Sequence, residues 1–156
     1  MNAVVRTILL MPPPPPAIVL RVEPIDRGHF LSALGQEESG LDLNKVGALG
    51  ERGPWQIRKK VWDSYVDAKK VPFEECASIP ETSAYVARAH FDWLSSRLKA
   101  HAVPITPENL ATAWLCGLAG CVRRIAEGNI PEAAVRVGNL YRSEMAVAPL
   151  KIERPR

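Results

Sequence analysis

Two adjacent glutamates, Glu37 and Glu38, end a run of apolar residues that has the spacing of one helix face. Phe30, Leu31 and Leu34 recur at steps of three and four before them. A carboxyl group at the end of such an apolar stripe loses hydration of its charged form, so its pKa rises. A carboxyl that stays protonated near neutral pH can deliver a proton to a breaking bond. The spacing predicts a raised pKa at the end of this stripe, but it does not choose between the two glutamates.

Four short segments occur in a fixed order along the chain. Residues 36–40 read QEESG and, after a glycine-bearing loop, residues 50–57 read GERGPWQI; residues 113–117 read AWLCG and residues 137–141 read VGNLY. This order resembles the lytic transglycosylase and goose-type lysozyme family, in which a helix ends in Glu-Ser and a loop then closes with Gly-x-x-Gly, two apolar residues and Gln. The resemblance runs from about residue 30 to residue 141 and is most specific in the first two segments.

The resemblance implies an enzyme that cuts the glycan strands of bacterial peptidoglycan between N-acetylmuramic acid and N-acetylglucosamine. It selects Glu38 as the single catalytic acid/base, because the family acid directly precedes the serine. This acid would protonate the glycosidic oxygen while the bond breaks through an oxocarbenium-like state. Two outcomes stay open. Either the muramic acid hydroxymethyl oxygen attacks its own anomeric carbon and leaves an anhydro-muramic end, or a water molecule attacks.

Three more residues take roles in the site from the same resemblance. Ser39 would hydrogen-bond the substrate or orient the acid, and Gln56 would line the cleft and bind sugar. Tyr141 would donate toward Glu38 or steady developing positive charge. Without the resemblance, the same residues fit plainer roles: a hydroxyl at the end of a helix, a solvated amide and a core aromatic ring.

Two tryptophans and a third glutamate leave alternatives open. Trp55 and Trp62 are candidates for stacking on sugar rings, although tryptophan at helical spacing more often belongs to the core. Glu51 stands where the family more usually has a small residue. It is either a second carboxylate of the cleft or, in the interpretation we favour, a solvated loop charge.

One departure from the family pattern favours a second function. Leu115 stands where the family has an Asn, which removes a polar group from the expected cleft. The alternative is therefore a catalytically degenerate lysozyme-like domain that binds glycan or a partner without cutting. A third hypothesis, a cytosolic helical interaction protein, rests on the cysteines and on the lack of a clear signal peptide.

Composition limits the classes of partner. The chain of 156 residues is 47% hydrophobic and 24% charged, which is ordinary for one globular domain. Its net charge of +3 comes from basic residues scattered among acids, so no nucleic-acid partner is expected. The histidines and the three cysteines form no local metal motif, and neither a metal nor another cofactor is expected. No apolar run approaches a membrane span, so we expect no stable membrane insertion, and we expect a monomer.

The two ends of the chain differ in character from the middle. Residues 1–24 form an arm in which the prolines from Pro12 to Pro16 should be extended polyproline II. The short apolar run before them makes a poor secretory signal, so the location stays open. The function implied by the resemblance would need a periplasmic or extracellular location, or delivery by a phage or secretion machine. Residues 147–156 are expected to be a C-terminal tail, frayed from Lys151 to Arg156.

Residues 25–146 should form one compact, all-α, lysozyme-like domain of about five helices. Apolar spacing, an N-cap threonine and helix-starting prolines place them. The expected helices run from Asp26 to Ser39, from Pro54 to about Lys70, through Ala84 to Leu98, from Thr106 through Val122, and from Pro131 to about Met145. The fourth helix is apolar on every side, so it is expected to be the hub of the core.

Overall fold

The computed structural model describes residues 23–147, and the statements that follow concern this part of the chain. The predicted arm, apart from its last two residues, and the predicted tail beyond residue 147 lie outside it. The helices are α1 Arg27–Ser39, α2 Lys59–Trp62, α3 Phe73–Cys76, α4 Pro80–Ala100, α5 Pro107–Ala126 and α6 Glu132–Val147. Between residues 23 and 147 the only β-structure is a pair of isolated bridges that Arg52 makes with Val46 and Ile57. The all-α prediction is confirmed.

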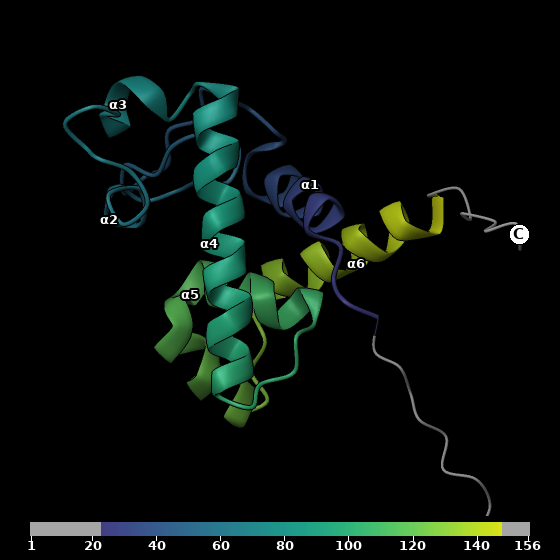
Figure 1. Cartoon of the computed structure of the whole chain (residues 1–156). Helices are drawn as coiled ribbons and strands as arrows, with labels where there is room; N and C mark the ends of the chain where they lie inside the picture. The colour runs from purple at the N-terminus through teal and green to yellow at the C-terminus, as the bar shows by residue number, and fades with distance from the viewer. Residues whose placement is uncertain (1–22, 148–156) are drawn as a thin grey trace, which may run out of the picture.

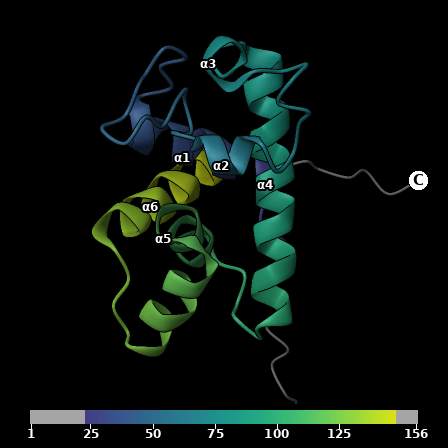
Figure 2. The ribbon, with the colours of Figure 1, turned by 90° about the vertical axis from the view of Figure 1, so that its left-hand side faces the viewer.

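The helices are arranged around the long, upright α4 (Figure 1). In this view α1 and α6 lie to the right of α4 and α5 lies beside its lower half, whereas α2, α3 and their loops lie near its upper end. The view turned by 90° shows α4 on one side of the molecule and α5 with α6 on the other (Figure 2). The pairs α5–α6, α1–α6, α4–α5 and α1–α4 pack directly against each other.

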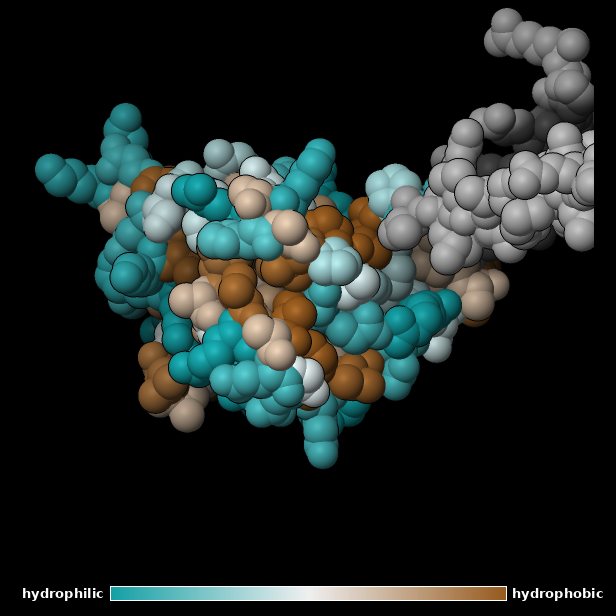
Figure 3. All heavy atoms as spheres, turned by 90° about the horizontal axis from the view of Figure 1, so that it is seen from below, coloured by the Kyte–Doolittle hydropathy of each residue, from teal (hydrophilic) through white to brown (hydrophobic). Residues whose placement is uncertain are grey.

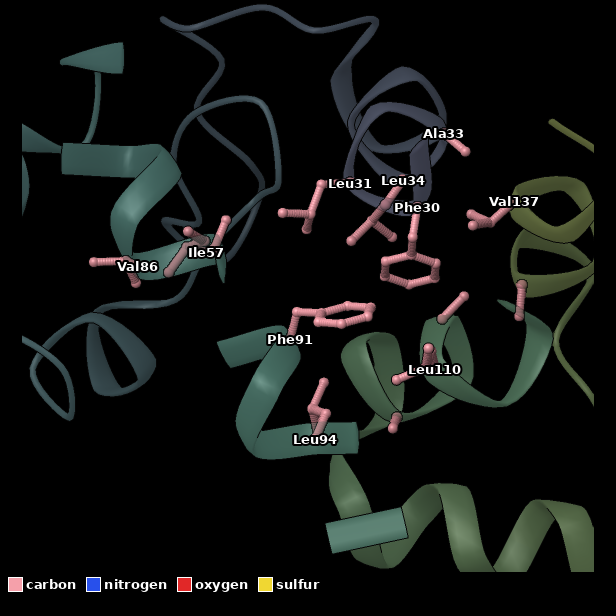
Figure 4. Packing of buried hydrophobic residues seen from close by; sticks show 14 of the residues in the cluster. Phe30, Leu31, Ala33, Leu34, Ile57, Val86, Phe91, Leu94, Leu110 and Val137 are labelled. Carbon is pink, nitrogen blue, oxygen red and sulfur yellow. The ribbon is translucent and has the colours of Figure 1, made fainter. Parts of the chain in front are cut away.

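One hydrophobic core joins all six helices. Phe30 of α1 and Phe91 of α4 meet with ring centroids 5.3 Å apart, in a tilted arrangement favourable for aromatic pairs. Leu34, Leu110 and Val137 bring α1, α5 and α6 into the same cluster (Figure 4). The buried apolar stripe that was predicted for residues 30–34 therefore packs at the centre of the molecule.

Helix α1 begins and ends where its sequence predicts. The Asp26 carboxylate accepts a hydrogen bond from the His29 backbone N–H at 2.8 Å and caps the first turn. Gly40 ends the helix in the left-handed conformation, with φ +67°, and its N–H donates to the Gln36 carbonyl. The two glutamates thus lie in the last turn of a well-defined helix.

The predicted helix from Pro54 to Lys70 is wrong over most of its length. Only Lys59–Trp62 is helical, because Arg52 and Ile57 exchange backbone hydrogen bonds of 3.0 Å and hold the residues between them in a tight loop. Ile57 and Trp62 are buried as predicted, but from a loop and a single helical turn. The short helix Phe73–Cys76 was expected to be a loop.

Helix α5 starts as predicted but is broken in the middle. The Thr106 hydroxyl caps it by accepting from the Asn109 N–H at 3.1 Å. Gly117 has φ +72° and ψ 166°, a conformation open to glycine and strained for other residues. The chain then turns back, so that the Cys121 thiol lies 3.3 Å from the Asn109 carbonyl. Residues 114–120 are partly exposed, and the prediction of an all-round buried hub is wrong there.

Apolar side chains also lie on the surface. On the face seen from below, hydrophobic residues gather across the middle between hydrophilic ones (Figure 3). Leu49, in the loop after α1, is among the most exposed large hydrophobic residues of the described range. No helix within residues 23–147 has the length and apolar character needed to cross a bilayer.

Candidate active site

A cleft of about 860 Å³ opens beside the end of α1. Its lining comes from α1, the following loop, the chain around α2, α4 and α5: Glu38, residues 47–49, Glu51, residues 56–58, Lys60, Val61, Ser64, Tyr65, His90, Trp93, Leu94 and residues 113–118. The break at Gly117 lies in the last of these segments, so the exposed middle of α5 forms one wall of the cleft.

Glu38 is half-buried in this cleft. No side chain or backbone group within residues 23–147 gives it a hydrogen bond or an ion pair. Burial raises the pKa of its carboxyl above the ordinary 4.5, and the negative charges of Glu37 and Glu51 raise it further. An acid with these surroundings holds its proton to a higher pH than an exposed glutamate does.

The neighbouring Glu37 has a different environment. Its carboxylate accepts from the Arg136 side chain of α6, with the closest N–O distance 2.7 Å. An arginine that contacts a carboxylate through two nitrogens stabilises its charged form. Of the two glutamates, Glu38 is therefore the one that faces the cleft, whereas Glu37 is held in an ion pair with α6.

Glu51 also lines the cleft, and the favoured interpretation of it as a solvated loop charge is wrong. Its side chain is only 14% exposed. One oxygen accepts from the Leu49 N–H at 3.0 Å, and the other lies 3.5 Å from the Arg58 guanidinium. The arginine balances its charge, so the structure places a second, ion-paired carboxylate in the same cleft as Glu38.

Gln56 lines the cleft as predicted. Its backbone is in the left-handed region, with φ +45°, and its amide donates to the carbonyls of Gly53 at 2.9 Å and Lys45 at 3.3 Å. Gly47 allows this arrangement, because an added Cβ there would lie 2.5 Å from both the Gln56 and Glu51 side-chain oxygens. The side chains of Gln56 and Glu51 therefore both lie against Gly47.

Ser39 does not line the cleft. Its hydroxyl donates to the Pro54 carbonyl at 2.9 Å and accepts from the Asp42 N–H at 3.1 Å. These bonds tie the end of α1 to the loop that carries Gln56. Of the two predicted roles, the contacts favour holding the acid in place and leave no free hydroxyl for substrate.

Tyr141 lies at the wrong end of α1 for its predicted role. Its ring is in the core, and its hydroxyl accepts from the Asp26 N–H at 3.0 Å. Twelve residues of helix rise separate Asp26 from Glu38, which is roughly 18 Å. The prediction that Tyr141 donates toward Glu38 is therefore wrong, because the order of the four segments says nothing about the direction in which this side chain points.

The two predicted candidates for sugar stacking are structural. Trp55 packs on α1, where its indole N–H donates to the Leu31 carbonyl at 2.7 Å, and it does not line the cleft. Trp62 is fully buried and donates to the Val71 carbonyl. Both indoles thus fit the core role that helical spacing favours, and the prediction of Trp55 as a substrate-binding residue is wrong.

The aromatic residues of the cleft were missed by the sequence analysis. Tyr65, His90, Trp93 and Trp114 line one part of it, and we call them the aromatic wall. The His90 ring lies nearly parallel to Trp93, at 11° and 5.8 Å between centroids, and edge-on to Trp114 at 4.7 Å. Burial lowers the pKa of His90 to about 4, so it is neutral near pH 7. Two signals pointed to them: the three-residue step between His90 and Trp93 on one helix face, and the position of Trp114 in the segment AWLCG.

Together these features define an all-α protein whose cleft holds a half-buried carboxyl, an ion-paired carboxylate and an aromatic wall. Residues 23–147 contain no group of three or more histidine, cysteine or acidic side chains that could hold a metal ion. No model of a known protein family matches the chain, and no curated protein is significantly similar to it.

Proposed function

We propose that the protein cleaves peptidoglycan glycan strands between N-acetylmuramic acid and N-acetylglucosamine, with Glu38 as the catalytic acid. The observation that carries the proposal is Glu38 itself, which is half-buried in the cleft with a raised pKa and makes no ion pair within the described range. The order of the four sequence segments supports the same function through their resemblance to lytic transglycosylases and goose-type lysozymes.

The first chemical step would be proton transfer from Glu38 to the glycosidic oxygen. The C–O bond breaks as the oxygen takes the proton, and positive charge develops on the sugar ring. Glu38 lies in the last turn of α1, at the negative end of the helix dipole. This end of the dipole also disfavours the charged form of the Glu38 carboxyl. After cleavage Glu38 is a carboxylate, and it would accept the proton of the attacking hydroxyl group.

Glu51 bears on whether cleavage is a hydrolysis or a transglycosylation. A second carboxylate in the cleft can hold a water molecule for attack, which favours hydrolysis, whereas transglycosylation needs no such group. Mass spectrometry of the released fragments distinguishes them, because hydrolysis adds one water to the product and transglycosylation leaves an anhydro-muramic end. We expect the hydrolytic product to decrease in Glu51→Gln.

The proposal is tested with purified sacculi. The full-length protein should reduce the turbidity of the suspension and release soluble muropeptides with new saccharide ends. A folded protein that releases no such fragments over a range of pH would refute the proposal.

A second candidate, a glycan-binding domain without activity, is favoured by Leu115. This side chain lines the cleft on the exposed wall of α5, in place of the polar residue of the family. A protein that sediments with insoluble sacculi but releases no sugar would support this candidate. Leu115→Asn would then be the variant in which to look for activity that the parent lacks.

A further inference from the structure

The aromatic wall presents an exposed ring next to a polar one. Trp93 is 40% exposed, although it lines the cleft. One neighbour is the nearly parallel His90 ring, and another is the Arg97 guanidinium, 5.6 Å from the Trp93 centroid. A cation at an exposed ring is held weakly, so a ligand can displace it.

The other rings of the wall are fixed by hydrogen bonds. The Trp114 indole donates to the Trp55 carbonyl at 3.0 Å. The Tyr65 hydroxyl lies 3.0 Å from His90 Nδ1. When the hydroxyl donates to Nδ1, the single proton of the neutral imidazole lies on Nε2, which has no partner within residues 23–147. The wall therefore combines pre-positioned apolar rings with one available N–H donor.

We infer that the aromatic wall is a sugar subsite that selects an N-acetylated pyranose, with the C–H face of the sugar against Trp93 and the acetamido oxygen accepting from His90 Nε2. An apolar surface with one well-placed polar group is the usual form of a selective small-molecule site. The subsite lies on α4 and α5, whereas the acid lies on α1. It deepens the proposed function, on which it rests, because it requires more than one sugar of a chain to contact the cleft.

Binding of chitotetraose, the uncharged β-1,4 tetramer of N-acetylglucosamine, tests the inference. The measurement is calorimetry in the Glu38→Gln background, so that no cleavage occurs. We expect Trp93→Ala to raise the Kd at least about tenfold, because stacking area is lost. Tyr85→Ala is the matched control: Tyr85 is an exposed aromatic on the same helix outside the cleft, and its loss should leave the Kd unchanged.

Cellotetraose, which lacks acetamido groups, tests the role of His90. The parent should bind it at least about tenfold more weakly than chitotetraose, because the donor is left without a partner. His90→Phe keeps an aromatic ring but no donor, and it should remove most of this difference. Equal Kd values for Trp93→Ala and Tyr85→Ala would overturn the subsite, and an unchanged preference in His90→Phe would overturn its selectivity.

The outcomes for the subsite and for the proposed function are separable. Sacculi that are cleaved through Glu38, together with unchanged chitotetraose binding in Trp93→Ala, would leave the function standing and refute the subsite. If Trp93→Ala loses chitotetraose binding but the parent cleaves no sacculi, the subsite stands and the proposed function is refuted. Circular dichroism checks that each variant is folded. If Trp93→Ala does not fold, Trp93→Leu is measured by the same calorimetry: a Kd raised at least about tenfold supports the subsite, and an unchanged Kd refutes it.

Discussion

The side of the molecule where α6 packs and the cleft differ in how they hold ionisable groups. Against α6, carboxylates are paired with arginines: Glu37 with Arg136 at 2.7 Å and Glu108 with Arg142 at 2.6 Å. In the cleft Glu51 is likewise paired with Arg58, but Glu38 and the half-buried ring of His90 contact no opposite charge within the described range. Two consecutive residues of one helix therefore differ in chemistry because they face different surroundings.

This difference separates structural charges from reactive ones. A carboxylate beside an arginine contributes a directional, charge-assisted contact. A buried group without an opposite charge is biased toward its neutral form, which costs stability whenever the solution favours the charged form. Glu38 and His90 in the cleft are groups of the second kind, and such groups suit proton transfer and the binding of uncharged sugars.

The largest expected effect comes from exchanging the two glutamates for amides in turn. Glu38→Gln should reduce the rate of sacculus cleavage by about a thousandfold, because the amide has no proton to give. Glu37→Gln should keep the rate at its own pH optimum within about fivefold, since it loses only a partly exposed ion pair. Turbidity assays with both variants measure this, and similar rates for the two would remove the distinction between them.

The next effect concerns stability in acid. The pKa of His90 is about 4 in the folded protein, against roughly 6.5 in an unfolded chain, so the unfolded state binds the extra proton as the pH falls through this window. At pH 5 this should lower the free energy of unfolding by about 2 kcal/mol relative to pH 7. Urea unfolding of the parent and of His90→Asn at both pH values measures it. Parallel pH dependence in the two proteins would show that His90 is not the cause.

A smaller effect of opposite sign is expected at Glu38. Its pKa is raised on folding, so the folded state binds more protons and stability falls as the pH rises through that range. Glu38→Gln should therefore unfold at higher urea than the parent at pH 7, and the difference should shrink below pH 4.5. Glu37→Gln, which loses the contact with Arg136, should not be stabilised. A Glu38→Gln protein less stable than its parent at pH 7 would contradict the account.

The smallest expected effect is a shift in the pH dependence of cleavage. The negative charges of Glu37 and Glu51 both raise the pKa of Glu38, and that of Glu37 does so more. Activity that needs protonated Glu38 falls as the pH rises through this pKa. The alkaline limb of the rate profile should therefore move to lower pH in Glu51→Gln and further in Glu37→Gln. Limbs that coincide with that of the parent would show that the three carboxyl groups are not coupled.

Local signals in the sequence predicted the parts of the fold that local interactions determine. The start of α1 beside Asp26, its end at Ser39 and the capping threonine before α5 all lie where the sequence predicted them. The loop after Gly53 was predicted as a helix, because its apolar spacing is helical while its shape depends on the pairing of Arg52 with Ile57. The sequence did not predict the break at Gly117, because a glycine inside a helix pattern is usually tolerated.

The candidate site divides in the same way. Glu38 and Gln56 come from neighbouring segments and do line one cleft. Tyr141 does not, because a residue distant in sequence needs a known helix orientation as well as a motif. The aromatic wall joins side chains from α4, α5 and the chain after α2, a combination that no single stretch of sequence contains.

The most direct test of the central claim is a carbon-13 NMR titration of the Glu38 side-chain carboxyl, assigned by the loss of its signal in Glu38→Gln. The buried position in the cleft predicts a midpoint above 4.5 that moves lower in Glu51→Gln. A midpoint at or below 4.5, unchanged in that variant, would contradict the claim that Glu38 is kept protonated for catalysis.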